Sequence, residues 1–136
     1  MKGSELNICV VEDSTLTLLL LQKMVEIFKV PIRVNTFTQG SRALEWIKNT
    51  VKDKEELGAI LVDLNMPEMS GWEFVAALEE ENPNIEVPVY IVSASCDPID
   101  KERIEEYPTI KGFLHKPLKV EDLERITDTK RQSSSC

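Results

Sequence analysis

Short apolar runs alternate with amphipathic segments along the whole of this chain of 136 residues. The apolar runs are rich in β-branched side chains, which predicts strands, and the apolar residues at helical spacing between them predict helices. Ser, Thr, Asp and Pro stand where helices would begin, and Pro31 ends the first of them. The predicted strands are 8–11, 32–37, 59–62, 87–92 and 110–114, and the predicted helices are 15–29, 41–51, 70–81, 98–106 and 120–129.

The alternation of strand and helix repeats five times, which predicts an α/β fold. We expect a doubly wound parallel sheet with right-handed crossovers and helices on both faces. One domain would span residues 6–129, with a short tail at 1–5 and a polar, disordered tail at 130–136. In such sheets, ligands bind beyond the carboxyl ends of the strands, where the strand order reverses, so functional side chains are expected at that edge.

Charged side chains follow three of the predicted strands at that edge. Glu12 and Asp13 come directly after the first strand, Asp63 follows the third, and Lys116 stands just beyond the fifth. Carboxylate oxygens are ligands that Mg²⁺ prefers, and an ammonium beside them can stabilise a transferring phosphoryl group. Each residue alone would more often be a solvated surface group, but together they predict a Mg²⁺ site beside a phosphorylatable aspartate.

The composition excludes some classes of function and leaves this chemistry in place. A formal net charge of −8 argues against a basic face for nucleic acid. The cysteines, Cys9, Cys96 and Cys136, show neither disulfide nor metal-binding spacing, which favours a cytoplasmic location. The N-terminus lacks the apolar core of a signal peptide, and the longest apolar stretch is too short to span a bilayer, so no membrane is expected among the partners.

Four markers at the strand ends resemble the receiver domain of two-component response regulators, and the similarity extends over about residues 6–129. The resemblance implies the flavodoxin-like (βα)5 arrangement with strand order 2-1-3-4-5, and a stand-alone, chemotaxis-regulator-like protein. The markers are the acid pair Glu12-Asp13, the segment 63–71, the pair Ser93-Ala94, and Lys116-Pro117.

The resemblance also implies a phosphorylation site with a bound Mg²⁺ ion. Asp63 would be the phosphoacceptor and, with Asp13, a carboxylate ligand of the metal. Asn65 would contribute its backbone carbonyl. Glu12 stands where the family more often has Asp, and we expect its longer side chain to act through water.

Three further residues are implied to respond to phosphorylation. Lys116 would pair with Asp63 at rest and with a phosphoryl oxygen afterwards, aimed by a cis peptide bond to Pro117. The Ser93 hydroxyl would turn to donate to that oxygen, and Phe113 would then move inward into the vacated space. The competing interpretation of Phe113 is a plain core residue, because aromatic side chains commonly fill strands.

The first predicted helix is unusually apolar. Helical periodicity places Leu18 and Leu19 on faces that they share with polar residues, so we expect one or both to be exposed beside the acid pair. In the family that the chain resembles, the phosphodonor protein approaches this helix, which makes both leucines candidate docking residues. Packing under the last helix or a loop is the alternative. The predicted inward stripe is Leu20, Leu21, Met24, Val25 and Phe28.

These features together predict a single-domain response regulator, a phospho-accepting switch and not an enzyme. A sensor histidine kinase or histidine phosphotransfer protein would donate to Asp63 in a Mg²⁺-dependent step, with slow self-dephosphorylation. No further domain is expected after Thr129, so the output would be a changed surface for an unknown downstream protein, in a monomer or a phosphorylation-dependent dimer. The alternative is a pseudo-receiver that binds without phosphorylation. A small phosphohydrolase is disfavoured because Asn65 stands where its second acid would be.

Overall fold

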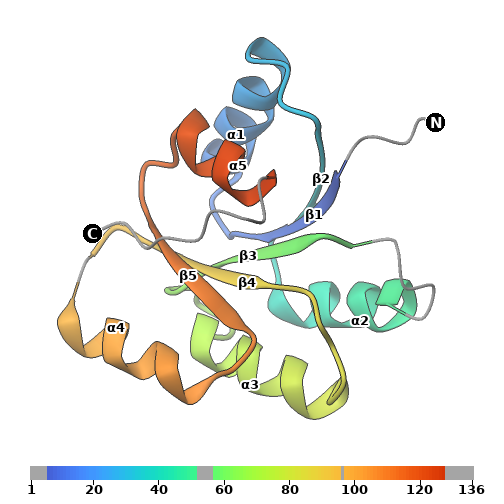
Figure 1. Ribbon diagram of the computed structural model, residues 1–136, viewed down its shortest axis with the longest axis vertical. Coiled ribbons are helices and arrows are strands. Elements are labelled where there is room, and N and C mark those ends of the chain that lie inside the picture. The colour runs from blue at the N-terminus through green and yellow to red at the C-terminus, as the bar shows by residue number, and fades with distance from the viewer. Residues whose placement is uncertain (1–5, 52–56, 96, 128–136) are drawn as a thin grey trace.

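Five parallel strands form one sheet in the computed structural model, which describes residues 6–51, 57–95 and 97–127. The order β2-β1-β3-β4-β5 (Figure 1) confirms the predicted flavodoxin-like α/β fold with strand order 2-1-3-4-5. The predicted tails at 1–5 and 130–136 lie outside the described residues. The strands are β1 (Leu6–Val11), β2 (Ile32–Phe37), β3 (Ala59–Asp63), β4 (Val89–Ser93) and β5 (Ile110–His115).

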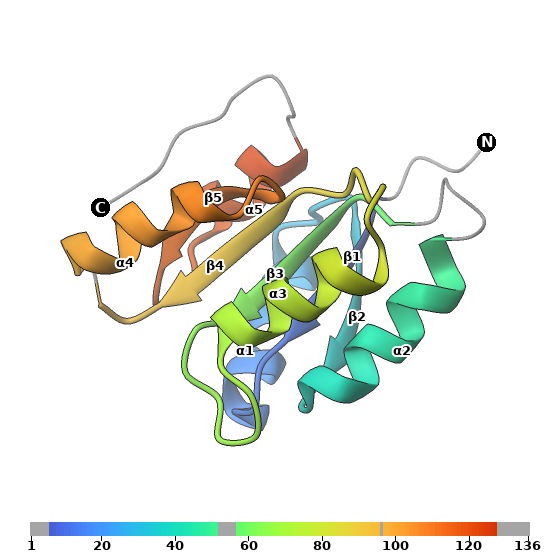
Figure 2. The same ribbon diagram turned by 90° about the horizontal axis from the view of Figure 1, so that it is seen from below.

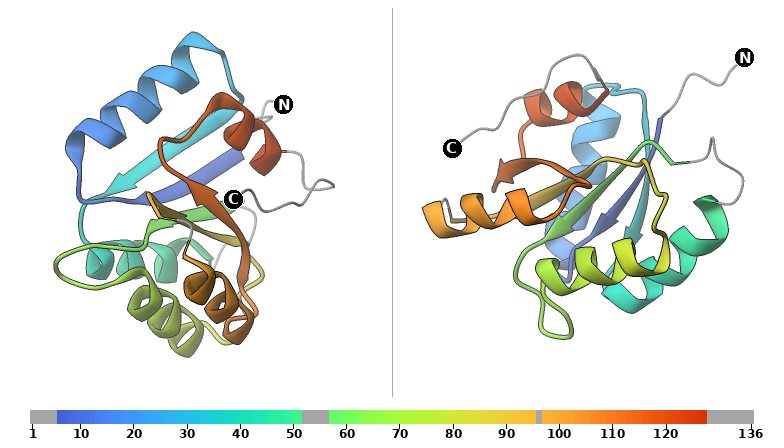
Figure 3. Two further views of the ribbon diagram at one scale, coloured as in Figure 1. Left: turned by 90° about the vertical axis from the view of Figure 1, so that its left-hand side faces the viewer. Right: turned by 60° about the horizontal axis from the view of Figure 1, so that its bottom comes forward.

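Helices cover both faces of the sheet. The helices α1 and α5 lie on one face, and α2, α3 and α4 lie on the other (Figures 1 and 3). The view from below shows α2 and α3 side by side across the sheet (Figure 2). Among the described residues, none of these helices has the length and apolarity that crossing a membrane requires. The helices are α1 (Thr15–Ile27), α2 (Gly40–Val51), α3 (Gly71–Glu81), α4 (Pro98–Arg103) and α5 (Val120–Thr127), with a 3₁₀ turn, η1 (Ile104–Glu106), after α4.

The central strand explains why the apolar runs are continuous and not alternating. Every residue of β3 is buried, because helices cover both faces of the sheet at its centre. The core on one side is built mainly by α2 and α3, and α3 turns Trp72, Phe74, Val75 and Leu78 inward. The core on the other side is built by α1 and α5. The carboxyl ends of the strands, where the functional side chains are expected, therefore stand next to a well-packed apolar core on each face of the sheet.

The predicted inward face of α1 is partly right: Leu21 is buried, and Met24 and Val25 pack against the core as predicted. Leu18 is only 7% exposed and packs in the core, whereas Leu20 and Phe28 of the predicted inward stripe are exposed. Leu19 is 51% exposed, as one of the two candidate docking leucines was expected to be. Leu18 therefore cannot be part of a surface for a partner. The reason is that the helix is apolar almost all round, so its periodicity does not specify which face is buried.

The loop between β3 and α3 is held close to the sheet edge by a glycine and a helix cap. A Cβ on Gly71 would stand 3.0 Å from the carbonyl oxygen of Asp63, so a larger residue would push the loop away. The Gly71 N–H donates to the carbonyl of Leu64 at 2.8 Å. Ser70 caps α3 in a reciprocal pair with Glu73, which fixes the point where the helix begins.

Candidate functional site

Three carboxylates meet where the strand order reverses. Glu12 follows β1, Asp63 is the last residue of the neighbouring β3, and the β1–β3 register pairs Val11 with Val62. One oxygen from each of Glu12, Asp13 and Asp63 lies within 4.8 Å of the other two. Glu12 and Asp63 are buried, at 3% and 5% exposed, while Asp13 is open to solvent. The structure thus brings together the three acids that the sequence placed at the strand ends.

Lys116 reaches this cluster from the loop after β5. Its Nζ lies 2.9 Å from Oε1 of Glu12 and 3.4 Å from Oδ2 of Asp63. The peptide bond to Pro117 is cis, as predicted, and the Lys116 N–H donates to the Ser93 carbonyl at 2.8 Å. The sequence predicted the contact with Asp63 but missed the shorter one with Glu12. The only signal for it in the sequence was the length of the Glu12 side chain.

The pKa values of this ion pair are shifted by burial and by each other. Burial raises the pKa of Glu12, and hydrogen bonds from Lys116 and from the Ser14 N–H, at 3.1 Å, offset part of that rise. Burial would lower the pKa of Lys116, but its hydrogen bond with Glu12 and the charges of Glu12 and Asp63 outweigh burial and raise it. Lys116 is therefore a stable ammonium at neutral pH. Three carboxylates and one ammonium leave the cluster formally short of positive charge.

Two further predicted site residues, Asn65 and Ser93, stand on segments next to Asp63. The Asn65 N–H donates to Oδ1 of Asp63 at 3.3 Å, so Asn65 adjoins the Asp63 carboxylate through its backbone. Ser93 ends β4 next to β3 and is buried, and its Oγ accepts from the Ser95 N–H at 3.1 Å. The Ser93 hydroxyl hydrogen is left to donate elsewhere.

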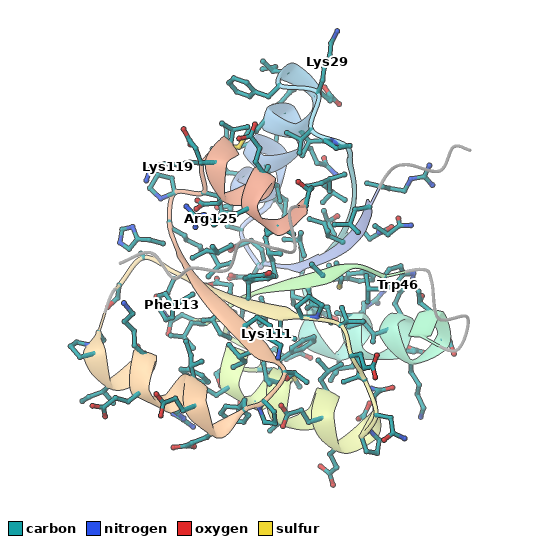
Figure 4. All side chains as sticks on the ribbon, viewed as in Figure 1. Lys29, Trp46, Lys111, Phe113, Lys119 and Arg125 are labelled. Atoms are coloured by element: carbon teal, nitrogen blue, oxygen red, sulfur yellow. The ribbon has the colours of Figure 1, made fainter. Side chains whose placement is uncertain are left out.

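Phe113 departs from its predicted resting position. The expectation that it moves inward only after phosphorylation is wrong for this structure, because the side chain is already 1% exposed. Figure 4 labels Phe113 on β5, where it joins the core on the α3 side with Trp72 and the partly buried Tyr107. The geometry is that of the competing interpretation, a core residue.

An apolar groove of about 620 Å³ lies beside Lys116, between α1 and the segment that follows β5. Leu20, Met24, Ile27 and Phe28 of the α1 side line it, together with Pro117 and Leu118. Exposed large apolar residues gather on the same helix and its C-terminal cap. They are Leu16, Leu19, Leu20, Ile27 and Phe28.

The chain belongs to the response regulator receiver domain family, whose model matches residues 8–128. Receiver domains of this family are phospho-accepting signalling switches of two-component systems. They interact with histidine kinases or histidine phosphotransfer proteins.

Plant response regulators are among the similar proteins. Two-component response regulator ARR7 of Arabidopsis thaliana is 29% identical over 130 residues, which cover 90% of this chain and 61% of ARR7. The chain thus spans about six tenths of the length of that relative. ARR17 of the same plant is 28% identical over 131 residues, which cover 90% of this chain and 82% of ARR17.

Solved structures share the fold at lower identity. A two-component response regulator from Cytophaga hutchinsonii has a TM-score of 0.82 at 19% identity, covering 92% of this chain and 96% of that one. The receiver domain of the sensor histidine kinase PA1611 from Pseudomonas aeruginosa PAO1, which has a magnesium ion coordinated in its active-site cleft, has a TM-score of 0.74 at 21% identity. It covers 93% of this chain and 97% of its own.

Proposed function

We propose that Asp63 accepts a phosphoryl group from a phosphohistidine of a sensor histidine kinase or histidine phosphotransfer protein. The observation that carries this proposal is the buried Asp63 carboxylate between an acid pair and an ammonium. An oxygen of Asp63 would attack phosphorus while the bond from phosphorus to the histidine nitrogen breaks. The imidazole leaves with that electron pair, and Asp63 becomes an acyl phosphate.

The donor set fits a hard cation such as Mg²⁺. All three acids offer carboxylate oxygens within 4.8 Å of one another, and oxygen is the donor that Mg²⁺ prefers. Asp13 and Asp63 would hold the ion through carboxylates, Asn65 through its backbone carbonyl, and Glu12 through water. When bound, Mg²⁺ would offset the charge of the acids and of the incoming phosphoryl group.

Lys116 and Ser93 would stabilise the phosphoryl group by fixed charge and hydrogen bonding. Lys116 already lies 3.4 Å from Oδ2 of Asp63, so a small movement would bring it to a phosphoryl oxygen. The Ser93 hydroxyl can donate to another phosphoryl oxygen while it still accepts from the Ser95 N–H. Neither residue would have to leave its strand end.

We propose that the output is a change in the surface formed by α4, β5 and α5, which a downstream protein would read. Ser93 and Phe113 stand on neighbouring strands, since Ile91 pairs with Phe113 and Ser93 with His115. A turn of Ser93 toward a phosphoryl group would alter the packing of the core to which Phe113 belongs and against which Tyr107 packs. Phe113 would then act from its buried position and not by moving inward.

The phosphodonor protein would dock on the groove between α1 and the segment after β5. This groove is apolar and includes Lys116, so a partner that fills it would hold its phosphohistidine near Asp63. Leu20 is exposed and lines the groove, and the exposed candidate Leu19 stands next to it in α1, outside the groove lining. Leu18 is excluded from this role by its burial.

Intact-protein mass after incubation with acetyl phosphate tests the assignment of Asp63. Wild type should gain the mass of one phosphoryl group with Mg²⁺ and none with a chelator, and Asp63→Asn should gain none in either condition. Asp100→Asn in α4 is the matched control, because it removes a carboxylate outside the cluster and should behave as wild type.

A pseudo-receiver would give a different pattern. No mass gain in folded wild type, with Mg²⁺ binding shown by calorimetry, would overturn the proposal and favour a module that binds partners without phosphorylation. A gain that persists in Asp63→Asn would place the acceptor elsewhere.

A further inference from the structure

The position of α4 depends on contacts at its C-terminal end. Within the described residues 98–106, neither α4 nor η1 has a buried residue, and Ile99 of α4 is 70% exposed. Ile104 in η1 and Tyr107 after it are partly buried against the core on the α3 side. A helix of six residues is unstable alone, so tertiary contacts must hold it in place.

Trp72 of α3 provides such a contact. Cζ of Arg103, the last residue of α4, lies 4.9 Å from the centroid of the Trp72 ring, which is the geometry of a cation–π contact. The ring of Tyr107 stacks on Trp72, with 5.8 Å between centroids and 20° between planes. Trp72 is 6% exposed and belongs to the core, so both contacts join the end of α4 to a well-packed ring.

Trp72 is also joined to the backbone of Asp63. It follows Gly71, whose N–H donates to the Leu64 carbonyl at 2.8 Å. A Cβ on Gly71 would stand 3.0 Å from the Asp63 carbonyl oxygen and from Cα of Leu64. Both are backbone atoms, which cannot turn aside as the end of a flexible side chain can. A displacement of the chain at Asp63 should therefore move Gly71 and Trp72 as well.

We propose that the contact between Arg103 and Trp72 holds α4 against α3, and that a displacement of the segment 63–71 breaks it. Arg103 is the positioning residue of this contact. The proposal rests on the output surface proposed above and deepens it. A phosphoryl group on Asp63 would act on α4 through Gly71 and Trp72, in addition to the packing around Phe113.

Hydrogen exchange of the α4 amides, followed by NMR, measures this contact without any phosphodonor. Arg103→Gln should speed exchange about three-fold, because it removes the cation over the Trp72 ring. Arg103→Lys keeps a cation on a long side chain and should restore part of the protection. Lys101→Gln is the matched control, because it removes a positive charge from the same last turn of α4 and should exchange as wild type.

Gly71→Ala tests the connection between Asp63 and α4. The added Cβ must displace the backbone at Asp63 or Leu64, so the α4 amides should exchange about three-fold faster than in wild type. In an Arg103→Gln background the contact is already lost, so the same substitution should have a smaller effect. Circular dichroism checks that each variant is folded.

Two outcomes would overturn the proposal. Exchange in Arg103→Gln that equals that of wild type, or of Lys101→Gln, would mean that the cation over Trp72 does not hold α4. Equal factors for Gly71→Ala in the two backgrounds would mean that the segment 63–71 does not act through this contact. Since these measurements use no phosphodonor, their failure is distinct from a failure of Asp63 to be phosphorylated.

Discussion

Two helices of similar length, α1 and α3, cover opposite faces of the same sheet. They differ in how many of their apolar side chains are buried. In α3 the large apolar side chains point inward, and Trp72, Phe74 and Leu78 are buried. In α1 only Leu18 and Leu21 are buried, although the helix is the more apolar of the two.

This difference separates residues that stabilise the fold from residues that are free for a partner. Burial of apolar surface is the main stabilising contribution, so an exposed leucine adds little to stability. A helix that is apolar all round is normally covered on all sides. The exposed face of α1 therefore has no explanation in the stability of the domain, and the docking proposal supplies one.

The largest difference in stability should appear between two phenylalanines. Phe74→Ala on α3 should lower the free energy of unfolding by about 3–5 kcal/mol, because it removes a fully buried ring from the core. Phe28→Ala at the end of α1 should change it by less than about 0.5 kcal/mol, because that ring is exposed. Urea unfolding followed by circular dichroism measures both. Equal losses would mean that the α1 face is covered in solution.

The same contrast explains what could be predicted from the sequence about the helices. In α3, the polar Glu73 stands between Trp72 and Phe74 and a run of glutamates follows Leu78, so the pattern specifies which face is outward. In α1, residues 18–21 are all leucine, so more than one face satisfies the helical spacing. The existence of α1 was therefore predictable, whereas its buried face depended on packing against the sheet and α5.

The sequence also predicts some features of the candidate site and not others. That Glu12, Asp13 and Asp63 meet could be predicted, because the carboxyl ends of neighbouring parallel strands share one edge. The partner that Lys116 prefers could not, since it depends on how far two flexible side chains reach. For Phe113 the sequence left two interpretations open, a switch residue and a plain core residue, because an aromatic residue on β5 fits either orientation; its buried position matches the second.

The next largest difference in the free energy of unfolding should appear between alanine substitutions of the adjacent Leu18 and Leu19. Leu18→Ala should lower the free energy of unfolding by about 2–3 kcal/mol, because its side chain packs in the core beneath α1. Leu19→Ala should change it by less than about 0.5 kcal/mol. A reversed ranking would mean that Leu19, and not Leu18, packs in the core beneath α1.

A charged substitution at the exposed Leu19 tests whether this face of α1 binds the phosphodonor protein. Leu19→Glu should slow phosphorylation by a histidine phosphotransfer protein and leave phosphorylation by acetyl phosphate unchanged, because only the protein donor needs the α1 face. Phosphorylation is followed by mass with each donor in turn. Equal slowing with both donors would mean that the substitution perturbs the site itself, and no slowing with either would remove Leu19 from the docking surface.

The smallest difference in the free energy of unfolding should come from substitutions at the C-terminal ends of α1 and α3. The N–H groups of Lys29 and Val30 donate to the carbonyls of Glu26 and Val25, at 3.3 and 3.1 Å, and close the last turn of α1. This closure requires the left-handed backbone found at Lys29, with φ of 53°, a position that glycine occupies in most helices of this kind. Lys29 points away from the molecule at the tip of α1 (Figure 4), so its side chain is not needed there for packing.

Lys29→Gly should therefore raise the free energy of unfolding by about 0.5–1 kcal/mol, even after the added freedom of glycine in the unfolded chain is subtracted. Asn82→Gly at the end of α3 is the matched control. Asn82 has φ of −133°, which carries no such strain, and its side chain donates to the Leu78 carbonyl at 3.2 Å. The control should thus lose stability in the same urea titration. A gain in the control, or a loss in Lys29→Gly, would mean that the ends of α1 and α3 are not held as their backbone geometry indicates.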